Sequence, residues 1–232
     1  MKVVNLKKLT PFYILLSVLF VLTLIPKGNI LLYLNTLHSV FWDRFFRNVT
    51  VFGDGAFIPV ILLISLIFFK FKYTYQFALS ASFQILIVLL LKQVLFTHIN
   101  RPYFFFSEEV KATLNFVAGV KIRYTDTFPS GHTATVFVIT SFLALVSKKK
   151  HRLLPYGLAL IGICVAISRV YLLQHFFIDI YFGMFFGIAS SVAGCYIVKK
   201  YPQKWYKKQL NIKWPPRVSA PIKKLLTTIN IL

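Results

Sequence analysis

Two histidines and one carboxylate have the types and spacing needed for nucleophilic and acid–base chemistry. His175 and Asp179 are four residues apart, which places both side chains on one face of a helix. The carboxylate can accept a hydrogen bond from one imidazole nitrogen, which fixes the tautomer and leaves the other nitrogen as a nucleophile or a base. His132 is a second imidazole, suited to donating a proton to a leaving oxygen.

Five further residues, predicted on the same outer membrane face, could hold an anion through positive charge or through the amides of a helix N-terminus. They are Lys92, Arg101, Ser130, Gly131 and Arg169. Together with the histidines they describe a phosphate pocket with a nucleophile and an acid. Each also has a simpler interpretation, because a lone Lys or Arg often anchors a span end and Ser130 is a good N-cap. The other histidines lack such neighbours and are assigned to the interface or to solvent: His38, His98 and His151.

The composition of the chain excludes a soluble globular domain. Of its 232 residues, 57% are hydrophobic and only 14% are charged, and the mean hydropathy is +0.70. The formal net charge of +21, beside long apolar runs, predicts an anionic membrane surface as partner and no nucleic acid. Cys164 and Cys195 lie within apolar stretches, which predicts two buried thiols and no disulfide framework.

Six apolar runs predict an all-α, polytopic membrane protein with six transmembrane helices. They cover residues 12–25, 56–69, 75–96, 133–146, 153–170 and 176–198. The aromatic, amphipathic stretch 31–46 predicts one short interfacial helix. These patterns predict a membrane domain over 1–198 and a basic cytoplasmic tail over 199–232, with an amphipathic helix near 222–232.

The distribution of charge orients these helices. With the N-terminus inside, 18 of the 27 Lys and Arg residues lie on the cytoplasmic side and all six Asp and Glu residues on the other. Both termini are therefore predicted to be cytoplasmic, with the candidate site at the outer (periplasmic) face of a bacterial inner membrane. The first apolar run is followed by Ile25, Pro26 and Lys27, which do not form the small-residue cleavage site of a signal peptide. We therefore predict that this run is an uncleaved membrane anchor.

At its polar motifs the sequence resembles the type 2 phosphatidic acid phosphatase family of membrane lipid phosphatases. Two of the three parts of the family signature match residue for residue: Pro129 to His132, and Ser168, Arg169, His175 and Asp179. The resemblance covers about residues 54–195. It implies a six-helix membrane domain in which His175 forms a phosphohistidine, Asp179 orients it and His132 protonates the leaving group. It also implies that the phosphoryl oxygens are held by Lys92, Arg101, Ser130, Gly131 and Arg169.

The first part of the signature departs from the family pattern. Eight residues separate Lys92 from Arg101, where the family usually has six. Nine steps along an ideal helix lead to the opposite face, so Lys92 joins the pocket only if the helix ends or bulges before Arg101. Pro102 favours such an end, because it disfavours helix at the preceding residue.

We predict metal-independent hydrolysis, without a cofactor, of a phosphomonoester or pyrophosphate on an outer-leaflet lipid headgroup. The family suggests lipid A phosphates, undecaprenyl pyrophosphate or phosphatidylglycerol phosphate as substrate, and Lys111, Lys121 and Arg123 favour a headgroup with several negative charges. Two alternatives are phosphoryl transfer to a second lipid and a lipid-binding or transport protein without turnover. Gly183 and Gly187 could mark a homodimer face or close packing within one chain.

Overall fold

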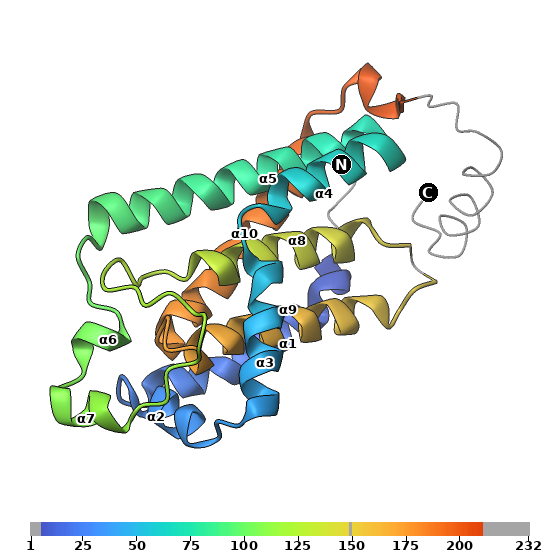
Figure 1. Ribbon diagram of the computed structural model, residues 1–232. Coiled ribbons are helices and arrows are strands. Elements are labelled where there is room, and N and C mark those ends of the chain that lie inside the picture. Colours follow the sequence, from blue (N-terminus) through green and yellow to red (C-terminus); the bar gives the residue numbers. More distant parts are fainter. Residues whose placement is uncertain (1–5, 149, 211–232) are drawn as a thin grey trace.

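The computed structural model describes residues 6–148 and 150–210, and this part of the chain is helical, without strands. Apolar helices form at all six predicted places (Figure 1). They are α1 (Thr10–Phe20), α4 (Phe57–Phe68), α5 (Phe71–Leu90), α8 (Gly131–Val146), α9 (Leu154–Tyr171) and α10 (Phe177–Lys200). The prediction of an all-α membrane protein is confirmed.

Not every apolar helix is long enough to cross a bilayer alone. Four helical segments are long and apolar enough: Leu6–Leu24, Phe71–Leu95, Leu154–Tyr171 and Phe177–Lys200. The pair Val40–Gly53 and Phe57–Phe68, bent by 58°, gives a fifth candidate, whereas α8 has only 16 residues. The described residues therefore offer four or five spans by this measure, and the count of six stays a prediction.

Helix α8 forms the centre of the bundle, with most of its residues buried against α5, α9 and α10. Two glycines of α10 permit its close approach to α8: a Cβ at Gly183 would lie 2.6 Å from the Ser130 carbonyl oxygen, and one at Gly187 would lie 2.6 Å from that of Ala134. Both glycines thus serve close packing within the chain. The homodimer stays a prediction that these glycines do not support.

The predicted single interfacial helix over 31–46 is wrong, because two helices form there: α2 (Asn29–Thr36) and α3 (Val40–Val49). Ser39 is extended, with φ −161° and ψ 161°, and its side chain accepts a hydrogen bond from the Trp42 amide at 3.3 Å. This N-cap starts a new helix. Figure 1 shows α3 crossing the direction of α8 and α9. The Tyr171 hydroxyl donates to Asp43 Oδ1 at 2.6 Å and thereby ties α3 to the end of α9.

Short helical segments also form in the long loop before α8 and in the segment after α10. The long loop 97–130 contains two short helices, α6 (Pro102–Phe105) and α7 (Glu108–Thr113). After α10, the 3-10 turn Lys204–Lys207 packs its aromatic rings against Tyr75, at the start of α5. The predicted tail helix near 222–232 lies outside the described residues. Both cysteines are free as predicted, with Cys195 buried and Cys164 half-buried.

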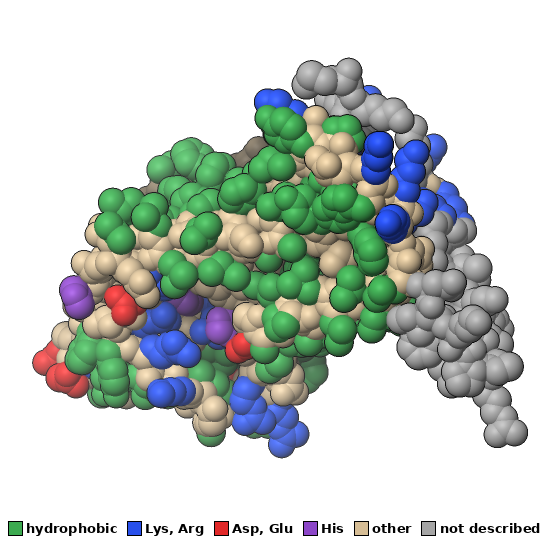
Figure 2. Space-filling view, turned by 90° about the horizontal axis from the view of Figure 1, so that it is seen from above, with side chains coloured by type: hydrophobic (Ala, Val, Ile, Leu, Met, Phe, Trp, Pro, Cys, Tyr) green, Lys and Arg blue, Asp and Glu red, His purple; other side chains and the backbone are tan. Residues whose placement is uncertain are grey.

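The charged side chains gather at the two ends of the molecule. Figure 2 shows Lys, Arg and His side chains around a hollow toward one end, with the acidic side chains beside them, and further Lys and Arg at the opposite end. Hydrophobic side chains cover much of the surface between the two groups. An apolar belt between charged ends is the surface that a membrane-integral protein requires.

Candidate active site

A cavity of about 660 Å³ opens where α8 begins and α9 ends. Six of the eight predicted site residues line it: Lys92, Arg101, Gly131, His132, Arg169 and His175. Lys121 and Arg123, from the loop between α7 and α8, add two further cations to the wall. The structure thus brings residues from four separate parts of the chain to one place, and Ser130 and Asp179 lie behind the lining.

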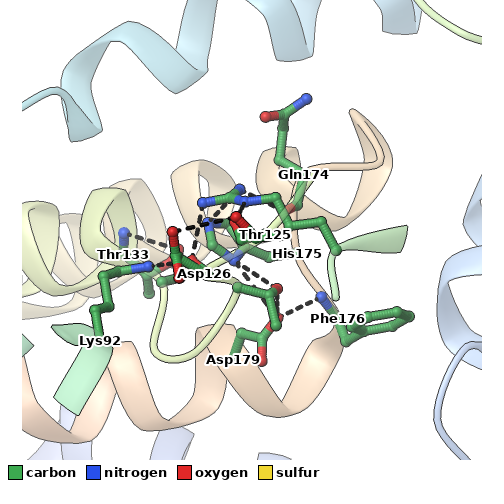
Figure 3. Close-up of polar contacts among 11 residues, drawn as sticks. Lys92, Thr125, Asp126, Thr133, Gln174, His175, Phe176 and Asp179 are labelled. Carbon is green, nitrogen blue, oxygen red and sulfur yellow. Dashed lines mark hydrogen bonds and ion pairs between the residues drawn. The ribbon is translucent and has the colours of Figure 1, made fainter. Parts of the chain in front are cut away.

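The His175 side chain is held from behind by a carboxylate. Its Nδ1 lies 3.5 Å from Asp179 Oδ2, and both side chains are buried (Figure 3). The same carboxylate oxygen accepts hydrogen bonds from the Phe176 amide, at 2.9 Å, and from the Thr127 hydroxyl. Thr127 Oγ1 also lies 3.3 Å from Nδ1. Because Nδ1 faces two oxygen atoms that can accept a hydrogen bond, we assign the proton of the neutral His175 imidazole to Nδ1.

The other nitrogen of His175 is left with a lone pair. Arg101 Nη1 lies 3.3 Å from His175 Nε2, and a guanidinium can only donate, so Nε2 accepts. Burial, and after it the charge of Arg101, hold the pKa of His175 well below its usual range. The imidazole is therefore neutral at pH 7, and its lone pair is on Nε2, the nitrogen that faces Arg101.

Arg101 is fixed by three backbone carbonyls. Its Nε donates to Thr125 at 2.6 Å, its Nη1 to Gln174 at 2.8 Å and its Nη2 to Asp126 at 3.1 Å. Burial lowers the pKa of Arg101 to about 10, so the side chain keeps its charge at neutral pH. A cation held in this way needs little reorganisation to bind a phosphoryl oxygen.

Lys92 reaches the cavity despite its unusual spacing. Helix α5 ends at Leu90 and continues as a π-helical turn, Leu91–Leu95, after which Phe96 leaves helical geometry. Lys92 Nζ donates to the Asp126 carbonyl at 2.5 Å, the same oxygen that Arg101 contacts (Figure 3). The condition set by the eight-residue spacing, an end or bulge before Arg101, is thus met.

Arg169 and His132 form the opposite side of the cavity, next to the turn that follows α3. Arg169 is 5% exposed and its Nη1 donates to Thr50 Oγ1 at 2.7 Å, while its buried Nε has no partner among residues 6–148 and 150–210. His132 Nε2 lies 4.0 Å from Asp54 Oδ2. Because Arg169 and His132 both line the cavity, the cation and the second imidazole can contact the same bound phosphoryl group.

The model of the PAP2 superfamily matches residues 73–203, more than half of the chain. The chain belongs to the PAP2 superfamily. Two solved structures share its fold: the crystal structure of Aquifex aeolicus LpxE, and that of a transmembrane PAP2-type phosphatidylglycerolphosphate phosphatase from Bacillus subtilis.

The LpxE match has a TM-score of 0.62 and 21% sequence identity, and covers 75% of this chain and 95% of that one. For the Bacillus protein the TM-score is 0.56 and the identity 18%, with 84% and 99% of the two chains covered. No curated protein sequence matches the chain. The resemblance read from the motifs is confirmed, and the fold is that of PAP2-type membrane lipid phosphatases.

In this PAP2 protein the hydroxyl of Ser130 does not line the cavity. It is buried and accepts hydrogen bonds from the amide and the hydroxyl of Thr133, at 3.4 and 3.0 Å. The Ser130 side chain therefore acts as the N-cap of α8. Phosphate binding by its hydroxyl stays a prediction, which the position of the hydroxyl does not support. Gly131 and His132 do line the cavity, and their amides, in the first turn of α8, have no partner within the helix.

Sequence reasoning missed four residues that hold the PAP2 site together. They are Thr50, Asp54, Thr127 and Asp126, of which Asp126 contributes its backbone carbonyl. Asp54 had a signal, since it is an outer acidic residue just before an apolar run. The other three act through folding of loops that are distant in sequence, for which a single sequence carries no signal.

Proposed function

We propose that this chain is a phosphatase of membrane lipids that cleaves a phosphomonoester or pyrophosphate through a phosphohistidine at His175. The observation that carries the proposal is the His175 imidazole, which lines a cavity together with five cations and has the Asp179 carboxylate 3.5 Å behind its Nδ1. Binding of an anion alone needs only the cations and the amides. The buried His175 and Asp179 pair adds a fixed nucleophile, which only turnover requires.

In the first step, the lone pair of Nε2 attacks phosphorus and the bond from phosphorus to the leaving oxygen breaks. In the empty cavity burial lowers the pKa of His132, so the negative charge of the bound substrate must first let His132 take up a proton from solvent, which it then gives to the leaving oxygen. Asp179 stabilises the imidazolium form of His175. Water then attacks the phosphohistidine, His132 accepts its proton, and inorganic phosphate and His175 are restored. During both steps Lys92, Arg101 and Arg169 neutralise the phosphoryl oxygens.

The substrate class follows from the walls of the cavity. Five cations line it. Two of them, Lys121 and Arg123, lie outside the three parts of the family signature, whose residues we assign to one phosphoryl group. We therefore propose a headgroup with more than one negative charge, with lipid A phosphates, undecaprenyl pyrophosphate and phosphatidylglycerol phosphate as candidates. Incubating purified protein with labelled forms of each, and measuring phosphate release, ranks these candidates.

A chemical trap tests the intermediate. Rapid quenching with labelled substrate should give a protein-bound phosphate that is labile in acid and stable in alkali, as a phosphorus–nitrogen bond is. Label that survives acid, or label absent from wild type during turnover, would contradict the scheme. Label that appears on a second lipid in place of inorganic phosphate would show phosphoryl transfer.

Chelation tests the role that we give to the cations. If Lys92, Arg101 and Arg169 neutralise the phosphoryl oxygens, saturating EDTA should leave the rate unchanged to within about twofold. A larger loss that Mg²⁺ or Zn²⁺ restores would mean that a metal ion performs this task.

We further propose an inner-membrane location with both termini cytoplasmic and the cavity open to the periplasm. Single cysteines at the exposed positions Ser107 and Lys150, after replacement of Cys164 and Cys195 by Ala, report the two sides. An impermeant thiol reagent applied to intact cells should label position 107 and spare position 150. The opposite pattern would place the site in the cytoplasm and exclude every substrate named above.

A further inference from the structure

A second cavity, of about 450 Å³, lies at the other end of the bundle. It is formed where three segments meet: the start of α1, the end of α8 and the start of α9. The catalytic cavity adjoins the first turn of α8, and this one adjoins the end of the same helix, roughly 22 Å away at the rise of an α-helix. The two cavities have no lining residue in common.

The lining of this second cavity is basic. Four Lys and Arg side chains and one His contribute to it, and none of its lining residues is acidic: Lys7, Lys8, Lys148, Arg152 and His151. Cations that serve only as snorkelling anchors have no reason to converge on one hollow, because like charges repel and diverge into water. Their convergence, with no acidic residue in the lining, makes this cavity a favourable place for an anion.

Part of the cavity wall is fixed by hydrogen bonds. Lys8 Nζ donates to the Leu145 carbonyl at 2.9 Å and to the Ser147 carbonyl, which ties the N-terminal segment to the end of α8. His151 Nε2 is buried and finds no hydrogen-bond partner within residues 6–148 and 150–210. Lys7 and Arg152 are exposed at the rim. The cavity thus has one wall held in place by the hydrogen bonds of Lys8, and two cations at its rim that a ligand can reach.

We propose that this cavity binds the phosphate group of an anionic phospholipid from the leaflet on that side of the membrane. The charge complementarity favours a phosphate, and the volume lies within the range of about 300–1,000 Å³ that is usual for small-ligand sites. Basic pockets between helices at a membrane surface hold anionic headgroups in this way. The proposal concerns binding only, so it stands or falls separately from catalysis.

Thermal unfolding of the full chain in an uncharged detergent measures this binding. Phosphatidylglycerol should raise the unfolding temperature, and phosphatidylcholine, whose headgroup has no net charge, should not. Inorganic phosphate forms a third arm, because it offers the same chemistry without the lipid. Because phosphate can also bind in the catalytic cavity as the product, only protection that the rim substitutions Lys7→Gln and Arg152→Gln remove is assigned to this site. Rim-dependent protection by phosphate equal to that by phosphatidylglycerol, at equal concentration, would overturn the lipid assignment.

The matched variants are Lys7→Gln with Arg152→Gln, at the rim, and Lys204→Gln with Lys207→Gln, on the 3-10 turn after α10. Both pairs remove two positive charges from exposed positions. The rim pair should weaken the apparent affinity for phosphatidylglycerol by about tenfold to thirtyfold, and the control pair by less than about threefold. Equal weakening in both pairs would overturn the site in favour of general surface attraction.

The rim pair should leave the unfolding temperature without lipid unchanged, since neither side chain is buried. If that temperature falls, the single variant Lys7→Gln, with native mass spectrometry of bound phosphatidylglycerol, replaces the pair. Retention of wild-type lipid occupancy by a folded variant would overturn the proposal.

Discussion

The two ends of the bundle each have a cavity lined by cations, but they differ in what lies beside those cations. At the catalytic end, Arg101 and Lys92 donate to backbone carbonyls, and His175 borders the cavity with Asp179 behind it. At the other end, Lys8 also donates to backbone carbonyls, but Lys7 and Arg152 are exposed, and no lining residue is acidic. We infer from this difference that positive charge is enough for the anion binding proposed at the second cavity, while the turnover proposed at the first needs a nucleophile and cations that are already in place.

The strongest test of this comparison removes the nucleophile. We expect His175→Ala to lower kcat/KM by more than about a thousandfold, because no other group near phosphorus can take its role. His151→Ala, at the other end, should leave the rate within about twofold. Steady-state phosphate release from both purified variants measures this. Retention of a tenth of wild-type activity by His175→Ala would assign the nucleophile elsewhere.

The second test changes how a cation is held while keeping its charge. Arg101→Lys should lower kcat/KM about a hundredfold, because an ammonium cannot reproduce three hydrogen bonds to carbonyls and face Nε2 as well. Arg152→Lys, at the other cavity, should have no effect on the rate. If both substitutions are neutral, charge alone is sufficient at the catalytic end and the contrast between the ends is wrong.

The helices that carry the site could be predicted from the sequence for a physical reason. α8 and α10 each begin where a polar motif meets an apolar run, and apolar length dominates the free energy of a helix in a bilayer. The break between α2 and α3 at Ser39 could not be predicted from the sequence. A polar N-cap competes there with a continuous amphipathic pattern, and the difference in free energy between one helix and two is small. Periodicity alone therefore joined α2 and α3 into one helix.

The candidate site was predictable where its chemistry depends on residue type. His175, Asp179 and His132 are recognisable from residue type and spacing, although the predicted shared helix face for His175 and Asp179 is wrong. Helix α10 begins at Phe177, so His175 lies in the turn before it, and the pair meets because Asp179 is in the first turn of that helix. Lys92 was doubtful because the argument assumed an ideal helix, and the π-helical turn at Leu91–Leu95 changes the direction of its side chain. Thr127 could not be found, since its role depends on a loop contact across 52 residues of sequence.

Thr127 provides the third test, as a positioning residue. Thr127→Val keeps the shape and removes the hydrogen bond to Asp179, so kcat should fall about tenfold while KM stays within about twofold. Thr127→Ser should restore most of kcat, because it returns the hydroxyl. An equal loss of activity in both variants would mean that the methyl packing matters and not the hydrogen bond. The split between kcat and KM separates positioning from a general loss of folded protein.

The smallest expected effect concerns Arg123, a cation of the catalytic cavity that we assign to a second phosphate of the substrate and not to the reacting phosphoryl group. Arg123 is exposed and lines that cavity, so Arg123→Gln should raise KM about threefold to tenfold for a lipid pyrophosphate and less than twofold for a monophosphate. Its kcat should not change, since the fixed cations still neutralise the reacting phosphorus. Lys150→Gln removes an exposed charge at the other end and serves as the control. Because the interaction is exposed, added salt should diminish the difference between wild type and Arg123→Gln. An equal increase of KM for both substrates would show that Arg123 attracts lipids in general and does not recognise a second phosphate.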